Sequence, residues 1–200
     1  MRKFSIHLGL ALAALIWAAP DARATFVINV TQDGPNLDFS GSGSLNLTGA
    51  TYHGTSNPMS YYFPIFGELV LGSDPGDNVV SDSYAITGPS TFGTTYAGGD
   101  FSSGTGGRVG FNMSAGDVYV PLGYISGTDL SSTDVLDGQT FATLGVSPGT
   151  YTWSLPNDQI ILNIGVPEPR AITLFAVPAV VSLYLTRRRR ARGAAPTSPV

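Results

Sequence analysis

Few residues in this sequence could carry acid–base or nucleophilic chemistry. Between Thr25 and Gly165 there is one histidine, His53, and neither a cysteine nor a lysine. A Ser-His-Asp triad needs an imidazole to move the proton between nucleophile and leaving group, but His53 lies in TYHGTSNP and no G-x-S-x-G elbow occurs. Thiol and Schiff-base catalysis would need the missing cysteine or lysine. We therefore expect His53 to be a surface turn residue.

Carboxylates are numerous, but nothing in the sequence marks a catalytic pair. Glycoside hydrolysis uses two carboxyl groups in complementary roles. The same stretch holds eleven aspartates and one glutamate, Glu68, which lies in the strand-like FGELVLG. We interpret Glu68 as a solvated charge on a strand. The inventory predicts that the protein is not an enzyme, and it disfavours the alternative of a hydrolase.

One acidic loop offers the oxygen ligands that calcium prefers. Its sequence, GSDPGDNVVSD, brings together Asp74, Asp77 and Asp82. The loop lacks the D-x-D-x-D-G run and the final glutamate of an EF-hand, so we prefer a plain acidic turn and keep a calcium site as the alternative. Zinc is not expected, because its usual sites use cysteines or several histidines. We expect no other cofactor.

Aromatic residues gather in SYYFPIFG, which contains Tyr61, Tyr62, Phe63 and Phe66. Exposed rings could stack on sugars, as in carbohydrate-binding modules, whereas buried rings would be ordinary core. We expect core. An exposed apolar patch would reverse that interpretation.

Charge is distributed unevenly along the chain. From Thr25 to Gly165 twelve carboxylates face a single basic residue, Arg108, so the net charge is 1 − 12 = −11. The other basic residues lie near the two ends of the sequence. Nucleic acid is not expected as a partner, because the acidic stretch has no cationic surface to displace counterions from phosphates.

The acidic stretch has the pattern of short β-strands. Runs such as TFVINV, GSLNLTG, GTYTWSL and DQIILNIG alternate apolar and polar residues between breaks rich in Gly, Pro, Asn and Ser, and no stretch shows a convincing helical period. We predict one all-β domain at 25–165, an antiparallel β-sandwich or jelly roll of eight to eleven strands. GTYTWSL and DQIILNIG should form its last pair of strands.

The first 24 residues have the features of a signal peptide. Arg2 and Lys3 precede an apolar stretch at 8–19, and Ala22 and Ala24 form a small-x-small cleavage site. We expect the Sec machinery to export the chain and signal peptidase to cut it before Thr25. A retained signal anchor is the alternative.

A second apolar segment, 171–185, precedes the arginines Arg187, Arg188, Arg189 and Arg190. As a helix it would rise about 22 Å, short of a hydrocarbon core of about 30 Å, so flanking residues must snorkel for it to span. We predict a transmembrane helix with the arginines in the cytoplasm. Pro167, Glu168 and Pro169 directly before it should be extended, because prolines prevent regular pairing. An ordinary single-span anchor is the alternative.

The Pro-Glu-Pro triplet, the apolar stretch and the arginine cluster at 166–192 resemble the PEP-CTERM sorting signal of Gram-negative bacteria. This resemblance implies recognition by an exosortase, which would remove the tail near the triplet and pass the body to the cell surface. We expect residues 193–200 to form a disordered tail.

Phrases of the body, including GSGSLNLTG, ITGPSTFG and TFATLGVSPGTYTWSL, resemble an uncharacterised exported β-domain often carried by PEP-CTERM proteins. That resemblance implies no known catalytic activity. Our hypothesis is a cell-surface or extracellular-matrix protein with a structural or adhesive role, partnered with exopolysaccharide. The alternative is a carbohydrate- or calcium-binding module of the same fold.

Overall fold

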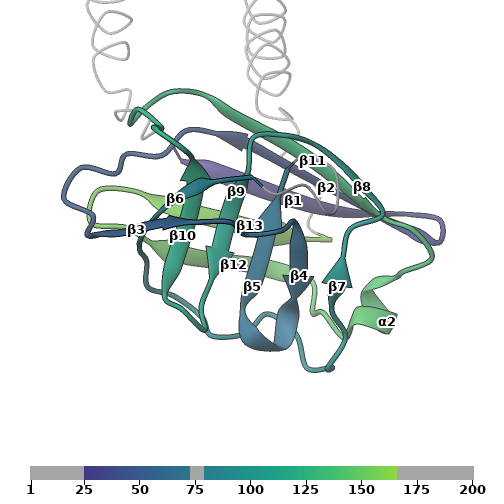
Figure 1. The fold of residues 1–200 in the computed structure, drawn as a ribbon. Coiled ribbons are helices and arrows are strands. Elements are labelled where there is room, and N and C mark those ends of the chain that lie inside the picture. Colours follow the sequence, from purple (N-terminus) through teal and green to yellow (C-terminus); the bar gives the residue numbers. More distant parts are fainter. Residues whose placement is uncertain (1–24, 73–78, 166–200) are drawn as a thin grey trace, which may run out of the picture. The chain divides into compact units, whose positions relative to one another are not determined.

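The computed structural model describes residues 25–72 and 79–165 (Figure 1). By its internal contacts the chain divides into two units, Met1–Val166 and Pro167–Val200, and every described residue belongs to the first. The predicted signal peptide at 1–24, the transmembrane helix and the tail at 193–200 lie outside the described residues. The predicted all-β class of the body is confirmed, because two stacked sheets form nearly all of its regular structure.

The six-stranded sheet runs in the order β12-β13-β1-β2-β11-β8. Its strands are β1 (Phe26–Asp33), β2 (Asn36–Gly43), β8 (Ser103–Gly106), β11 (Leu130–Leu136), β12 (Gly149–Ser154) and β13 (Gln159–Ile164).

The seven-stranded sheet runs in the order β3-β6-β10-β9-β5-β4-β7. Its strands are β3 (Tyr52–Ser56), β4 (Tyr61–Phe63), β5 (Glu68–Leu71), β6 (Ser81–Ala85), β7 (Gly99–Asp100), β9 (Val109–Asn112) and β10 (Asp117–Pro121). The thirteen strands of the described residues exceed the eight to eleven expected. Some of them carry no apolar alternation, such as the two-residue β7 and β8, whose sequence SGTG holds no apolar side chain.

One pair of strands contradicts the prediction of a purely antiparallel fold. β1 and β13 pair in parallel, with Phe26 opposite Ile160 and Val30 opposite Ile164. Alternation reports which side chains are buried, and these residues are indeed buried, but it carries no information on strand direction. The predicted pairing of β12 with β13 is confirmed and is antiparallel.

Aromatic packing joins the two sheets. Trp153 of β12 stacks on Phe111 of β9 with ring centroids 3.8 Å apart and an interplanar angle of 25°. The Trp153 indole Nε1–H donates to the Pro89 carbonyl at 3.0 Å, which satisfies its one polar atom. Phe92 meets both rings edge-on, so segments from both sheets and their connections share one core.

The segment GSLNLTG forms no strand after Gly43, the last residue of β2, contrary to the prediction. Leu45 and Leu47 are buried as the alternation implies. Their backbone N–H groups donate to the Tyr124 hydroxyl at 2.9 Å and the Ser126 hydroxyl at 3.0 Å instead of to a neighbouring strand. Side chains far away in the sequence therefore take the place of the hydrogen bonds that a neighbouring strand would make. A local sequence pattern cannot reveal such contacts.

Helix is minimal within residues 25–72 and 79–165. There is a 3₁₀ turn, η1 (Pro64–Phe66), and one short helix, α2 (Phe141–Leu144), which Thr140 caps at its N-terminus. Neither is long and apolar enough to cross a membrane.

Candidate functional site

A row of polar and aromatic side chains crosses the outward face of the seven-stranded sheet. Strand register places five residues side by side: Phe63, Glu68, Asn112, Asp117 and Ala85. Residues that are directly paired point to the same face of a sheet. The next paired positions, Tyr62, Leu69, Phe111 and Val118, are buried between the sheets. The row therefore faces outward, and each of its members is partly exposed.

At one end of the row lies an aromatic surface cluster of Phe63, Phe66 and Tyr96. Ring centroids are 6.4 Å apart for Phe63 and Phe66 and 5.5 Å apart for Phe66 and Tyr96. Phe66 is 39% exposed and Tyr96 is 77% exposed. The rings are inclined to one another, by 48° for Phe63 and Phe66 and by 88° for Phe66 and Tyr96, so Phe66 and Tyr96 each offer a separate aromatic surface to solvent.

Local backbone geometry creates this cluster. Pro64 starts the 3₁₀ turn and is buried, and Gly67 ends it with φ 62° before β5 begins. The tight turn leaves Phe66 on the outside. Gly98 lies directly against the ring of Phe63, where an added Cβ would stand 2.0 Å from Cδ1. The glycine allows the segment that carries Tyr96 to lie against this ring.

A hollow of about 270 Å³ lies against the cluster and is lined by Phe63, Phe66, Glu68, Tyr96 and Ser114. Another hollow of about 300 Å³ lies near the connection between β12 and β13, but its lining holds neither a charged side chain nor an aromatic ring. Binding sites combine apolar surface with a few converging polar groups. The hollow beside the cluster has that combination.

Beside the hollow, Tyr61 and Asn112 form a partly buried polar contact. The Asn112 side-chain amide donates to the Tyr61 hydroxyl at 2.8 Å. Burial raises the pKa of the Tyr61 phenol, and the Glu68 carboxylate raises it further, against a lowering by Asn112. For Tyr119, burial is again the main cause of a raised pKa, followed by Asp117 and then Glu68. The two phenols therefore stay neutral hydrogen-bonding groups beside two carboxylates.

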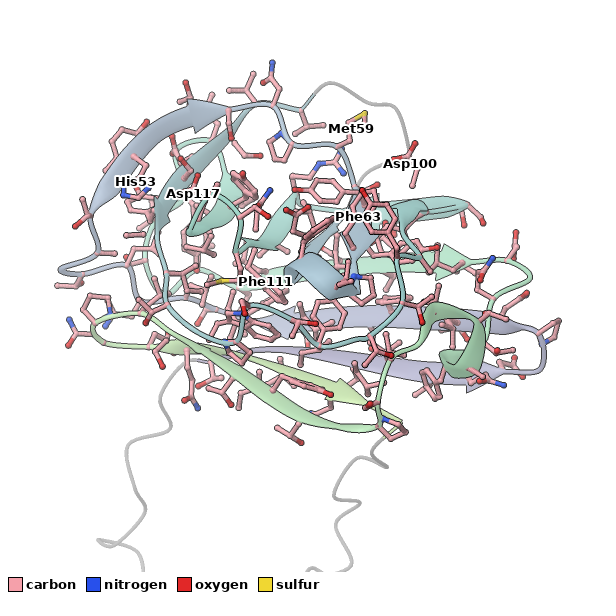
Figure 2. The ribbon with its side chains drawn as sticks, turned by 90° about the horizontal axis from the view of Figure 1, so that it is seen from below. His53, Met59, Phe63, Asp100, Phe111 and Asp117 are labelled. Carbon is pink, nitrogen blue, oxygen red and sulfur yellow. The ribbon has the colours of Figure 1, made fainter. Side chains whose placement is uncertain are left out.

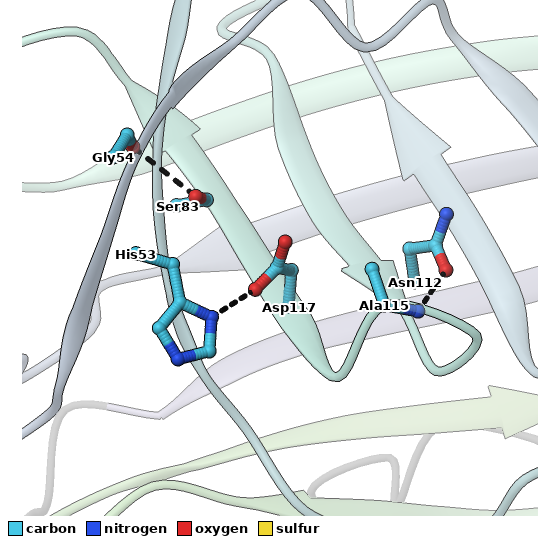
Figure 3. Close-up of polar contacts among 6 residues, drawn as sticks. All are labelled: His53, Gly54, Ser83, Asn112, Ala115 and Asp117. Carbon is cyan, nitrogen blue, oxygen red and sulfur yellow. Dashed lines mark hydrogen bonds and ion pairs between the residues drawn. The ribbon is translucent and has the colours of Figure 1, made fainter.

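At the other end of the row, His53 meets Asp117 (Figure 2). Strand register shifts between Tyr52 and Gly54, so His53 is the extra residue of a β-bulge, a device that can redirect a side chain. Its Nδ1 lies 2.6 Å from Oδ1 of Asp117, although β6 separates their strands (Figure 3). The β6 residue in register with Asp117 is Ala85, whose small side chain leaves room for this reach.

These placements test two interpretations of the sequence. His53 is on the surface, with its side chain 42% exposed, but it lies in strand β3, so the expected turn is wrong. The expected core location of the SYYFPIFG aromatics is right for Tyr62 and wrong for Phe66. The 3₁₀ turn between β4 and β5 separates them, and the proline at 64 was the signal that could have revealed it.

Of the three residues of the possible calcium site, only Asp82 lies among the described residues. Asp74 and Asp77 lie outside the described residues. Asp82 is buried in β6, where Oδ1 accepts from the Tyr52 hydroxyl at 3.1 Å and Oδ2 accepts from the Gly123 N–H at 2.7 Å. Within 25–72 and 79–165 no group of three His, Cys, Asp or Glu side chains could hold a metal.

The sequence signals at both ends also lie outside the described residues. They are Ala22, Ala24, Pro167, Glu168, Pro169, Arg187, Arg188, Arg189 and Arg190.

No family model, curated protein or solved structure is significantly similar to this chain. The functional argument therefore depends on the residues and their geometry.

Proposed function

We propose that this chain is an exported protein of the cell surface or extracellular matrix, whose β-sandwich adheres to polysaccharide through the aromatic surface cluster. The observation that carries the proposal is the exposure of Phe66 and Tyr96 beside a hollow with polar lining. Sugar rings have apolar faces that stack on aromatic rings and hydroxyls that bond to polar edges. Glu68 and Ser114 supply such edges within the hollow.

Delivery to the surface follows from the two ends of the sequence. The signal peptide at 1–24 would direct export, and the segment at 166–192 would hold the protein in the membrane until an exosortase cuts near Pro167-Glu168-Pro169. The acidic body supports this destination, because its net charge of −11 favours solubility outside the membrane. The protein would then be a non-catalytic adhesive component.

Binding can be tested on a glycan array with the full-length chain. Phe66→Ala and Tyr96→Ala should each weaken the strongest glycan signal. Loss of one anchoring ring typically costs about 1–2 kcal/mol, or roughly five- to thirtyfold in affinity. Leu122→Ala and Ile125→Ala are matched controls, because these apolar side chains are exposed elsewhere and should leave binding unchanged. Equal losses in all four variants, or no glycan bound at all, would contradict the proposal.

Processing can be tested by mass spectrometry of the surface-located protein. The expected mature form starts at Thr25 and lacks the arginine cluster. Detection of Arg187 to Arg190 in that form would contradict cleavage near the Pro-Glu-Pro triplet, while leaving the binding proposal intact.

A further inference from the structure

The hollow beside the aromatic cluster has a lining suited to a cation. Phe63, Phe66 and Tyr96 contribute three rings, and Glu68 contributes a carboxylate. The face of an aromatic ring carries a negative partial charge and attracts ammonium groups within about 6 Å of its centroid. Rings and carboxylate therefore favour the same sign of charge on a ligand.

No basic side chain of the body can balance this lining. Arg108 is the one basic residue between Thr25 and Gly165, and it is buried with 1% of its surface exposed. Glu68 makes no hydrogen bond or ion pair with a side chain among the residues that the structure describes. A positively charged ligand group would be the first direct partner of this carboxylate.

Neighbouring groups extend the negative field along the row. Glu68 and Asp117 lie on either side of Asn112 in the strand register, and both carboxylates contribute to the raised pKa of Tyr119 after burial. His53 partners Asp117 at the far end of the row. His53 therefore partners Asp117 and not Glu68, and the negative charge of Glu68 remains beside the aromatic hollow.

We infer that the hollow recognises the ammonium group of an amine-bearing glycan. A sugar ring stacks on Phe66 or Tyr96, and its protonated amine lies beside the Glu68 carboxylate. This inference rests on the proposed polysaccharide binding and narrows it to one chemical class. Glycans rich in carboxylate or sulfate are disfavoured, because they would bring like charge to the Glu68 carboxylate, and the one arginine among residues 25–72 and 79–165 is buried.

Calorimetric titration of the full-length chain can test the inference with two probes of equal length. A glucosamine hexasaccharide carries free amines, and its N-acetylated counterpart carries neutral amides. We expect the free-amine probe to bind about tenfold more tightly at low salt, and the preference should shrink as salt screens the charges. Glu68→Gln keeps the size of the side chain and should abolish the preference.

Asp100→Asn is the matched control, because Asp100 is an exposed carboxylate on strand β7 of the same sheet (Figure 2). It should retain the preference for free amines. A preference that survives Glu68→Gln, or that Asp100→Asn removes equally, would overturn the assignment to Glu68. Tighter binding of a uronic-acid hexasaccharide would overturn the charge argument itself.

The same titrations separate this inference from the broader proposal. If both hexasaccharides bind equally and Phe66→Ala weakens both, the polysaccharide site stands and the ammonium preference is wrong. If neither probe nor any arrayed glycan binds, both proposals fail.

Discussion

The outward faces of the two sheets use polar residues in opposite ways. Across the six-stranded sheet, register aligns an unbroken polar row: Thr150, Asn163, Asn29, Ser40, Thr133 and Thr105. Members of this row bond to one another. Asn163 donates to Asn29 at 3.0 Å, the Thr150 hydroxyl donates to Asn163 at 2.9 Å, and the hydroxyls of Thr105 and Thr133 lie 2.9 Å apart.

Among the described residues, members of the row on the seven-stranded sheet make no side-chain hydrogen bonds to one another. Its aromatic end leaves Phe66 and Tyr96 exposed, and its Glu68 has no side-chain partner within 25–72 and 79–165. Hydrogen bonds between members of a row stabilise the sheet, whereas exposed rings beside a carboxylate without a side-chain partner are available to a ligand. We therefore expect mutations on the first face to change stability and mutations at the aromatic end of the second to change binding.

The largest expected effect on stability lies where the two sheets meet. Asp134 of β11 is buried, and its Oδ2 accepts from the Gly72 N–H at 2.8 Å, just beyond the end of β5. Burial raises the pKa of Asp134 to about 7, against lowering by the Gly72 hydrogen bond and by Arg108. As pH rises from about 4 to 7, the unfolded carboxyl ionises while the native one stays protonated, so this group's contribution to stability falls.

Asp134→Asn should remove that part of the pH dependence. Melting curves between pH 4 and 8 should show the variant gaining stability relative to the parent as pH rises, reaching a Tm difference of several degrees above pH 7. Asp137→Asn, at an exposed carboxylate just after the same strand, should leave the slope unchanged. Equal slopes for the parent and Asp134→Asn would contradict the buried-acid interpretation.

A smaller loss of stability is expected when the hydrogen bonds of the polar row on the six-stranded sheet are broken. Asn163→Ala removes the donor to Asn29 and the acceptor for Thr150, which should lower the free energy of unfolding by about 1 kcal/mol. Glycan affinity should not change. Thr152→Ala is the control, since this threonine is exposed on the neighbouring strand β12. If denaturant titration shows equal losses in the free energy of unfolding for the two variants, the hydrogen bonds of the row do not stabilise the sheet.

The smallest effect is expected at the histidine end of the other row. His53→Ala breaks the contact with Asp117, but a surface pair of this kind contributes about 0.2–1 kcal/mol. A double-mutant cycle with Asp117→Asn would measure the coupling. Glycan binding should be unaffected if the site ends at the aromatic hollow. A loss of affinity only for long oligosaccharides would instead show that the ligand extends along the row.

Much of the body was predictable because its signals are local. Alternation in TFVINV and DQIILNIG correctly identified the buried residues of β1 and β13, and the predicted pairing of GTYTWSL with DQIILNIG was correct. Parts of β2 and β11 that are rich in Ser and Gly carry no such signal. In β2, Gly41 packs so tightly that an added Cβ would meet the ring of Phe26 at 2.6 Å, and in β11, Ser132 is buried opposite it. Small residues occur at these positions because neighbouring segments pack closely there. A local apolar pattern does not reveal such close packing.

The sequence by itself determined the all-β class of the body, its negative charge and its poor inventory for catalysis, because these depend on composition and on period-two patterning. Tertiary structure alone decided which aromatics face solvent. A 3₁₀ turn separates buried Tyr62 from exposed Phe66, and Tyr96 joins the cluster from a distant segment. Contacts between residues far apart in the chain also paired His53 with Asp117 and placed Glu68 beside the rings. Such contacts depend on strand order and register, which residue types and their spacing do not encode locally.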